Sequence, residues 1–205
     1  MLICIGQYLK TLDTAILFCF YIVMKTLRYI DGNLLLNKEI EVLAHSCNCQ
    51  NTFGSGIARS ILEMYPEAYA ADTLANQIRL AGGGVGNVLG NYSVSYIEPA
   101  TRQKHGTKIN HIFNLYGQNL GTDKSKLYDR KTNYEALYCA LEKMAYTLIH
   151  GEAFSAHRYQ TVGFPYKMGS DRGGGSWDIV ERMIAVAFNG YLGDVLIVKL
   201  EPSKP

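Results

Sequence analysis

Apolar residues along this chain follow two different periods, and segments of the two kinds alternate. In the stretch 133–150, apolar side chains recur at helical spacing and fall on one face of a helix. The same spacing predicts helices at 56–65, 66–79 and 177–188. Short apolar runs, several of them rich in branched or aromatic residues, predict strands at 27–30, 40–46, 88–97, 108–116, 161–166 and 194–200. A polar turn is predicted at 101–106, between strands 88–97 and 108–116.

Strands separated by helices predict an α/β protein in which helices cover both faces of one sheet. In such sheets, ligands bind in the crevice at the carboxyl ends of the strands. We therefore expect function to lie in the loops after strands 40–46 and 161–166, because each loop leads from a strand into a helix.

The N-terminal residues do not fit this alternation. Residues 15–24 are all apolar, but a bilayer span takes about 20 such residues. We predict an apolar extension over 1–23 and a single domain over 24–205. The extension is open to three interpretations: a product of an upstream start, an amphipathic appendage or a targeting segment. No membrane partner is expected.

Composition narrows the function classes. A chain of 205 residues suits one domain. Its 20 Lys and Arg against 18 Asp and Glu leave a net charge of +2, and no dense basic patch stands out, which argues against duplex nucleic acid as a partner. Five cysteines at irregular spacing favour a reducing compartment, the cytoplasm.

The loop after strand 40–46 contains Gly54 and Gly56 and feeds directly into a helix. Glycines let the backbone approach an anion with no Cβ in the way. The N–H groups of Gly56, Ile57 and Ala58 would then face that anion at the positive end of the helix dipole. Taken alone this is weak evidence, because tight turns that bind nothing are more common.

The loop after strand 161–166 has the sequence MGSDRGGGSW over residues 168–177. Successive N–H groups in such a glycine-rich turn can form a concave anion site. A disordered linker is the alternative, and it fits poorly between a strand and a helix led by Trp177. Two such loops at one edge of a sheet would hold a diphosphate between them, and the pair is more specific than either loop alone.

Several of these strings resemble the macro domain family, and within it the ADP-ribose 1″-phosphate phosphatase branch. They are LAHSCNCQNTFGSGIA, the Gly32-Asn33-Leu34 sequence before it, the YPEA after it and the GSDRGGGSW loop. The resemblance extends over about residues 25–201. It implies a three-layer α/β/α fold with a mixed central sheet that binds ADP-ribose between the two loops, with no metal and no cofactor.

The resemblance also implies roles for individual residues. Asn33, preceded by Gly32, matches the adenine-binding position, where many macro domains have Asp and where an amide pairs differently with the base. Asn48 matches the asparagine that touches the distal ribose. The residues matching the two diphosphate loops are Gly54, Ser55, Gly56, Ile57 and Ala58 in the first and Gly169, Ser170, Gly173, Gly174 and Gly175 in the second.

Two residues are candidates for catalysis. His45 matches the histidine implicated in the phosphatase-like branch, and histidine can move a proton near neutral pH. Asp171, in the second loop, could orient water at the distal ribose. The alternatives are a hydrogen-bonded structural histidine and an aspartate that caps the turn or pairs with Arg172. Tyr116, at the end of a central strand, is a candidate for stacking on adenine.

The most probable function is a metal-independent hydrolase of ADP-ribose 1″-phosphate that releases phosphate and ADP-ribose. The same pocket could remove ADP-ribose from the carboxylates of ADP-ribosylated proteins. The alternative is a non-catalytic reader that binds ADP-ribose. His45, Cys47 and Cys49 do not match the usual spacing of zinc ligands. Small ADP-ribose derivatives are thus the expected partners, and a monomer the expected state.

Overall fold

The computed structural model describes residues 25–81, 88–118, 130–151 and 160–201. The predicted extension 1–23 lies outside the described residues and stays a prediction. No helix in the described ranges is both long and apolar enough to cross a membrane.

Within these ranges, six strands form one sheet in the order β1-β6-β5-β2-β4-β3. All neighbouring strands are parallel except β3 and β4, which are antiparallel, so the sheet is mixed. The strands are β1 (Arg28–Asp31), β2 (Val42–Asn48), β3 (Tyr92–Tyr96), β4 (His111–Gln118), β5 (Val162–Pro165) and β6 (Val195–Lys199).

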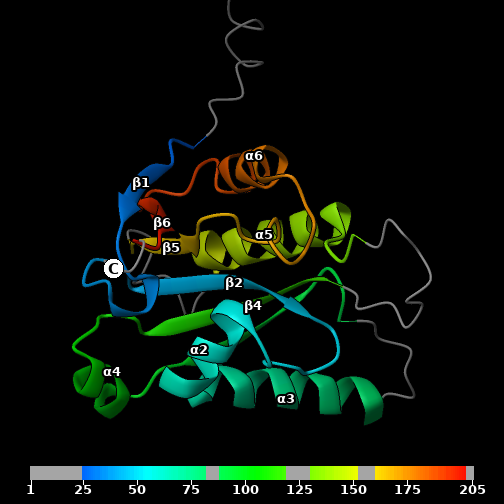
Figure 1. The fold of residues 1–205 in the computed structure, drawn as a ribbon, viewed down its shortest axis with the longest axis horizontal. Helices are drawn as coiled ribbons and strands as arrows, with labels where there is room; N and C mark the ends of the chain where they lie inside the picture. Colours follow the sequence, from blue (N-terminus) through cyan, green and yellow to red (C-terminus); the bar gives the residue numbers. More distant parts are fainter. Residues whose placement is uncertain (1–24, 82–87, 119–129, 152–159, 202–205) are drawn as a thin grey trace, which may run out of the picture.

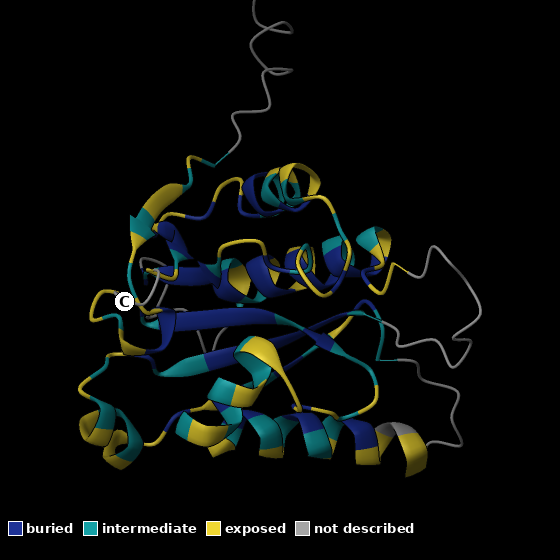
Figure 2. Cartoon of the chain, viewed as in Figure 1, coloured by how far each residue is buried: buried dark blue, intermediate teal, exposed yellow. Residues whose placement is uncertain are grey.

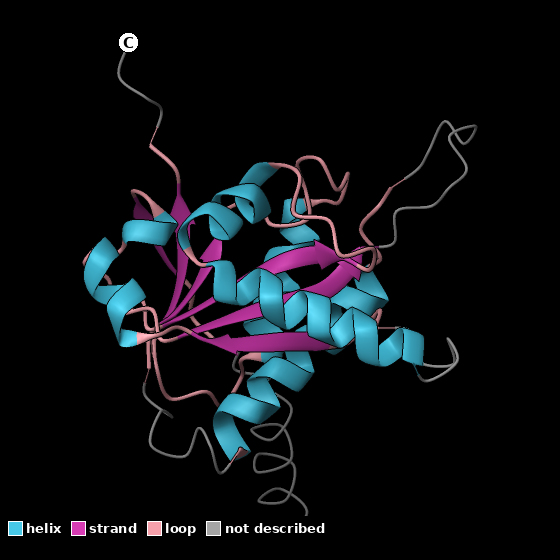
Figure 3. Ribbon diagram, turned by 90° about the horizontal axis from the view of Figure 1, so that it is seen from below, coloured by secondary structure: helices cyan, strands magenta, loops and turns pink. Residues whose placement is uncertain are grey.

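Helices cover both faces of the sheet (Figures 1 and 3). Helices α5 (Tyr134–His150) and α6 (Trp177–Ala187) lie on one face, and α2 (Gly56–Met64) and α3 (Pro66–Ala81) on the other. Two separate apolar cores result, one between the sheet and α5 and α6, the other between the sheet and α2 and α3. Figure 2 shows the buried strands between these helices. The expected three-layer α/β/α fold with a mixed sheet is confirmed.

The segment 101–106, predicted as a polar turn, instead belongs to a short helix, α4 (Pro99–His105). Proline at its start supplies a helical φ. At its end Gly106 is left-handed, with φ of 64°, and its N–H bonds to the carbonyls of Arg102 and Gln103. None of its residues is buried, so no apolar periodicity could reveal this helix. A 3₁₀ turn, η1 (Leu34–Leu36), was also not predicted; Asn33 caps it.

The sheet order places the two loops expected to carry function side by side. Strands β2 and β5 are direct neighbours and parallel, with Val42 opposite Val162 and Leu43 opposite Gly163. Their carboxyl ends therefore lie at the same edge of the sheet. The loops that lead into α2 and α6 leave from that edge.

Asn133 supports both α5 and this edge of the sheet. Its Oδ1 accepts a hydrogen bond from the N–H of Ala136 at 3.0 Å, and its own N–H donates to the carbonyl of Gly117 in β4. Asn133→Ala removes the side-chain cap and is expected to lower the free energy of unfolding by about 1 kcal/mol. Urea denaturation measures this. Asn133→Asp, which keeps an acceptor oxygen, is the control, and its free energy of unfolding should fall much less. Equal decreases in the two variants would contradict the capping role.

Candidate functional site

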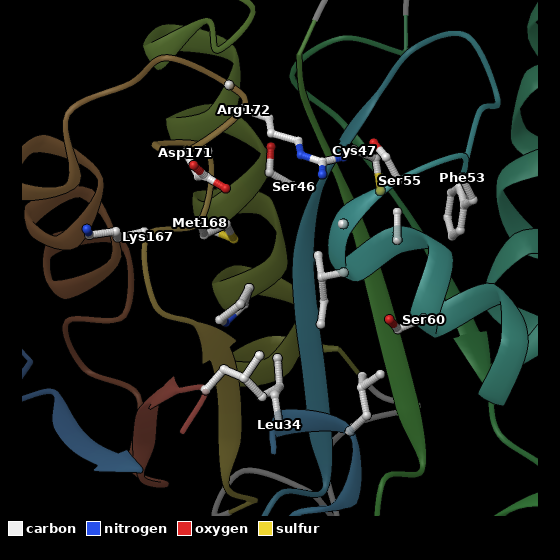
Figure 4. Close-up of a pocket in the computed structure, with 18 of the residues that line it drawn as sticks. Leu34, Ser46, Cys47, Phe53, Ser55, Ser60, Lys167, Met168, Asp171 and Arg172 are labelled. Carbon is white, nitrogen blue, oxygen red and sulfur yellow. The ribbon is translucent and has the colours of Figure 1, made fainter. Parts of the chain in front are cut away.

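A cleft of about 780 Å³ opens at the carboxyl ends of β2 and β5, a volume typical of small-molecule sites. Its walls are η1, the start of α2 and the loop after β5 (Figure 4). Both glycine-bearing loops contribute to this one cleft. Its lining includes Gly32, Asn33, Leu34, Ser46, Cys47, Asn48, Phe53, Ser55, Gly56, Ile57, Ala58, Glu63, Gln118, Tyr166, Lys167, Met168, Gly169, Asp171, Arg172 and Gly173.

The first loop ends at the N-terminus of α2. Ser55 occupies the N-cap position with extended backbone, and its side chain makes no capping hydrogen bond. Gly56 has φ of 60°, a conformation that glycine adopts without strain. The first N–H groups of a helix have no partner within it. Those of Gly56, Ile57 and Ala58 are therefore available at the positive end of the dipole, and all three residues line the cleft.

Asn48 fixes the shape of this loop. Its Nδ2 donates to the carbonyl of Thr52 at 2.8 Å, and its Oδ1 accepts from the N–H of Gln50 at 2.9 Å. The side chain thus closes the turn that β2 leads into, and it still borders the cleft.

The second loop is held in shape by contacts that leave no room for side chains. The Thr132 hydroxyl donates to the carbonyl of Gly169 at 2.7 Å, and the Thr132 N–H donates to the carbonyl of Gly173 at 3.0 Å. A Cβ on Gly173 would lie 2.4 Å from both the Gly169 oxygen and the Thr132 hydroxyl, closer than real atoms approach. The Gly175 N–H also donates to the Gly169 carbonyl. Glycine is needed here for packing.

Most of the predicted site residues meet in this cleft. Those that line it are Gly32, Asn33, Asn48, Ser55, Gly56, Ile57, Ala58, Gly169, Asp171 and Gly173. Figure 4 shows the Asp171 carboxylate directed toward the interior of the cleft. The predicted residues outside the lining are His45, Gly54, Tyr116, Ser170, Gly174 and Gly175. The roles assigned to all of them stay predictions.

His45 lies beneath the cleft and not in its wall. It is fully buried, its Nε2 is 2.8 Å from Oδ1 of Asn114, and its ring meets the edge of Phe53. Burial lowers the pKa of His45 to about 4, so the imidazole is neutral at pH 7. Cys47 contacts both His45 and the cleft: its Sγ lies 3.4 Å from Nε2 of His45, and Cys47 itself lines the wall.

Tyr116 belongs to the same buried layer. Its hydroxyl lies 2.7 Å from Oδ1 of Asp72 and 2.9 Å from the hydroxyl of Ser93. Burial raises the pKa of Asp72 and that of Tyr116. The ring therefore lies among the core side chains under α3 and is not part of the lining of the cleft. The aromatic side chains that do border the cleft are Phe53 and Tyr166, which sequence reasoning missed although both lie in or next to the predicted loops.

Four charged side chains also line the cleft, and two of them have partners. Glu63 pairs with Arg59 at 3.0 Å on α2, and the Lys167 ammonium lies 5.5 Å from the centre of the Tyr166 ring. Asp171 and Arg172 are exposed, and neither belongs to an ion pair within the described part of the chain. The alternative left open by the sequence, an ion pair between Asp171 and Arg172, is therefore not formed in this geometry.

No three His, Cys, Asp or Glu side chains within the described ranges gather closely enough to hold a metal ion. The binding chemistry that the cleft offers consists of backbone N–H groups, amide and hydroxyl side chains and the two unpaired charges.

Several solved structures similar to this chain are macrodomains. The macrodomain of Thermus aquaticus DarG matches with a TM-score of 0.60 and 22% identity, covering 87% of this chain and 99% of that one. The structure of a macrodomain protein from Streptomyces coelicolor matches with a TM-score of 0.60 and 19% identity over 87% of this chain and all of that one, 100%. Thermosipho africanus DarTG in complex with ADP-ribose matches with a TM-score of 0.59 and 13% identity, over 88% of this chain and 43% of that one.

Curated proteins give two kinds of match. An uncharacterized 17.5 kDa protein from the tk-vs intergenic region of Enterobacteria phage T4 is 29% identical over 178 residues, which cover 85% of this chain and 97% of that protein. The ADP-ribose 1″-phosphate phosphatase of Saccharomyces cerevisiae is 41% identical over 46 residues, 22% of this chain and 26% of the yeast protein. No protein-family model matches the chain.

The burial of His45 predicts a pH dependence of stability. Its pKa is about 4 in the folded protein against 6.5 when exposed. Between these pH values the unfolded chain binds a proton that the folded chain does not, so the free energy of unfolding falls as the pH falls through this window, by about 3 kcal/mol in total. His45→Asn keeps a polar side chain but cannot titrate. Urea denaturation between pH 7 and pH 4 should give a shallower dependence for the variant.

Asp72 makes this comparison with a variant necessary. Its raised pKa acts in the opposite sense, because the folded protein binds the Asp72 proton more readily than the unfolded chain does. Only the difference in pH dependence of the free energy of unfolding between the parent protein and His45→Asn reports the contribution of His45. If both lost stability equally with falling pH, the neutral buried imidazole would be refuted.

Gly173→Ala tests the tight packing of the second loop. The added methyl would collide with the backbone oxygen of Gly169, and such overpacking costs about 1–3 kcal/mol. Gly54→Ala is the matched control for folding, because a Cβ there meets nothing within 4 Å. Thermal denaturation should show a clear loss for Gly173→Ala and little change for Gly54→Ala. Similar denaturation midpoints for the two variants would show that the second loop rearranges to accept the methyl group at little cost.

Proposed function

Because this chain is a macro domain by its fold, we propose that it binds ADP-ribose in the cleft and hydrolyses ADP-ribose derivatives at the distal ribose. The observation that carries the proposal is the convergence of both glycine-bearing loops on one cleft. ADP-ribose 1″-phosphate is the proposed substrate, and esters that link ADP-ribose to protein carboxylates are a second one.

The diphosphate would lie between the two loops. The free N–H groups at the start of α2 face it from one side, and the backbone of Gly169 and Gly173 borders it from the other. Such donors are already in position before the ligand arrives, so binding costs little rearrangement. Charge-assisted hydrogen bonds from N–H groups to phosphate oxygens are stronger than neutral ones.

The adenosine would occupy the end of the cleft near Asn33 and Leu34. The Asn33 Oδ1 already accepts a hydrogen bond from the N–H of Leu35 at 2.9 Å. Its Nδ2 is then the atom left to donate to an acceptor nitrogen on the base. The distal ribose would lie at the other end, near Asn48 and Asp171.

Hydrolysis of the 1″-phosphate needs one water molecule and yields ADP-ribose and inorganic phosphate. As the oxygen of that water attacks the phosphorus, Asp171 accepts a proton from it. The bond between the phosphorus and the ribose oxygen breaks, and Asp171 returns the proton to that leaving oxygen. Backbone N–H groups of the loops stabilise negative charge that develops in the transition state. The exposed position of Asp171 in the wall of the cleft supports this role.

His45 is proposed to act from its buried position, without touching the substrate. Its neutral ring is buried next to Cys47 and bonded to Asn114. Direct proton transfer from His45 to a substrate would require the ring to leave this buried position.

The same burial favours a second candidate function. Among the residues that the structure describes, no histidine lines the cleft, and such a cleft also suits a reader, which recognises ADP-ribose without cleaving anything. The short match to fungal ADP-ribose 1″-phosphate phosphatases supports the hydrolase. Both functions share the same binding cleft, so they differ only in turnover.

Asp171→Asn is expected to separate binding from turnover. It should lower the rate of phosphate release from ADP-ribose 1″-phosphate by about 100-fold or more, and change the Kd for ADP-ribose by less than about threefold, because no hydrogen bond to the diphosphate is lost. A phosphate-release assay and calorimetry measure the two quantities. Asp178→Asn, an exposed aspartate outside the cleft, is the control and should behave like the parent protein.

Two outcomes would change the conclusion. Binding of ADP-ribose without release of phosphate from the parent protein would establish the reader. Absence of ADP-ribose binding would remove the proposed function altogether.

A further inference from the structure

The two cations that line the cleft differ in what holds them. Lys167 lies over the ring of Tyr166. Arg172 is exposed, and within the described ranges it has neither an ion pair nor a cation–π contact. By contrast, Arg130, just before α5, donates to the carbonyl of Thr132 and lies over the Tyr134 ring. Arg172 is thus a cation in the wall of the cleft whose donors remain available.

The backbone that carries Arg172 is fixed although its side chain is exposed. The flanking Gly173 is buried against Thr132 and Gly169. The N–H of Gly174 donates to the carbonyl of Asp171 at 3.1 Å. A guanidinium attached to such a braced turn is presented at a defined place. In Figure 4 it extends from the second loop toward the end of β2, where Ser46 and Cys47 lie.

The position of Arg172 along the cleft determines which part of a bound ligand its guanidinium could contact. Leu34 and Arg172 lie at opposite ends of the close-up in Figure 4. Arg172 therefore lies far from the proposed adenosine end and beside the residues assigned to the distal ribose. Asp171, next to it, contributes a negative charge. A phosphate at this end of the ligand would carry close to two negative charges at neutral pH and would be repelled by that carboxylate unless a cation stood beside it.

We propose that Arg172 forms a subsite for a phosphate group on the distal ribose and so makes the cleft selective for phosphate monoesters over neutral esters. The inference rests on the proposed function, because it needs ADP-ribose to lie with its distal ribose at this end. Guanidinium groups bind phosphate through two parallel N–H···O bonds. An ester to a protein carboxylate is uncharged at the corresponding position and gains nothing from this cation.

The test compares the affinities of two ligands, ADP-ribose and ADP-ribose 1″-phosphate, by calorimetry in an Asp171→Asn background that limits turnover. The background protein is expected to bind the 1″-phosphate at least about tenfold more tightly than ADP-ribose. Adding Arg172→Gln should remove most of that preference while the Kd for ADP-ribose stays within about threefold. Arg172→Lys should restore only part of it, since an ammonium binds phosphate without the paired geometry.

Lys167→Gln is the matched control. It removes the same charge from the same loop, so a non-specific loss of positive potential would affect both variants alike. The ratio of the two affinities should stay within about twofold in Lys167→Gln, whatever happens to each affinity separately.

The outcomes separate this inference from the proposed function. If Arg172→Gln bound ADP-ribose and kept the full preference for the 1″-phosphate, the subsite would be refuted and the ADP-ribose cleft would stand. Equal loss of preference in Arg172→Gln and Lys167→Gln would also refute it, in favour of a general electrostatic effect. If the background protein bound neither ligand, the proposed function itself would fail.

Discussion

The parallel pairing of β2 with β5 is the constraint on which the cleft depends. Adjacent strands lie about 4.8 Å apart, so loops that leave their carboxyl ends can contact one ligand, whereas an intervening strand would roughly double that separation. Gly163 of β5 lies opposite Leu43. A Cβ on Gly163 would come within 2.3 Å of Ile40, which is fully buried in the core under α2. The Ile40 side chain thus fills the space over Gly163, and a larger residue at this position would disturb the strand from which the second loop leaves.

The two walls are then stabilised in different ways. Asn48 closes the first loop on itself with its own amide group. In the second loop the Ser170 hydroxyl donates to the carbonyl of Met168 at 3.3 Å. Thr132, from a different part of the chain, also holds this loop through the backbone of Gly169 and Gly173. Because Thr132 lies directly before the cap of α5, the position of that helix and the shape of the second loop are coupled. This arrangement holds both loops in shape and leaves the N–H groups at the start of α2 available, which suits recognition of an extended anion by main-chain groups.

Sequence reasoning predicted the fold and the loops well because both rest on local patterns. Helix α5 combines regular apolar spacing with a cap at Asn133, and the glycine-bearing turns stand out between a strand and a helix. Helix α4 was not predicted, because none of its residues is buried and its sequence therefore has no apolar face. The positions of His45 and Tyr116 could not be predicted from the sequence for another reason. Both residues lie in central strands of a sheet that is covered on both faces. The face that such a residue occupies depends on strand pairing and helix placement, not on its neighbours in sequence. Arg172 was visible only as a partner for Asp171, because a loop sequence does not specify where its side chains point.

That alternation of faces also limits where chemistry can occur. Along β2, Val42 and Ala44 face the core under α5 and α6, while Leu43 and Cys47 face the core under α2 and α3. His45 shares the second face, and its hydrogen bond to Asn114 of the adjacent β4 holds it there. Turning its ring into the cleft would break that bond and leave the Asn114 oxygen unpaired in a buried place, a cost of about 1–3 kcal/mol. Loop residues beyond the strand ends face no such cost. Reactivity in this cleft is therefore expected to depend on the loops, where Asp171 and Arg172 bring opposite charges to the same end without neutralising each other in an ion pair.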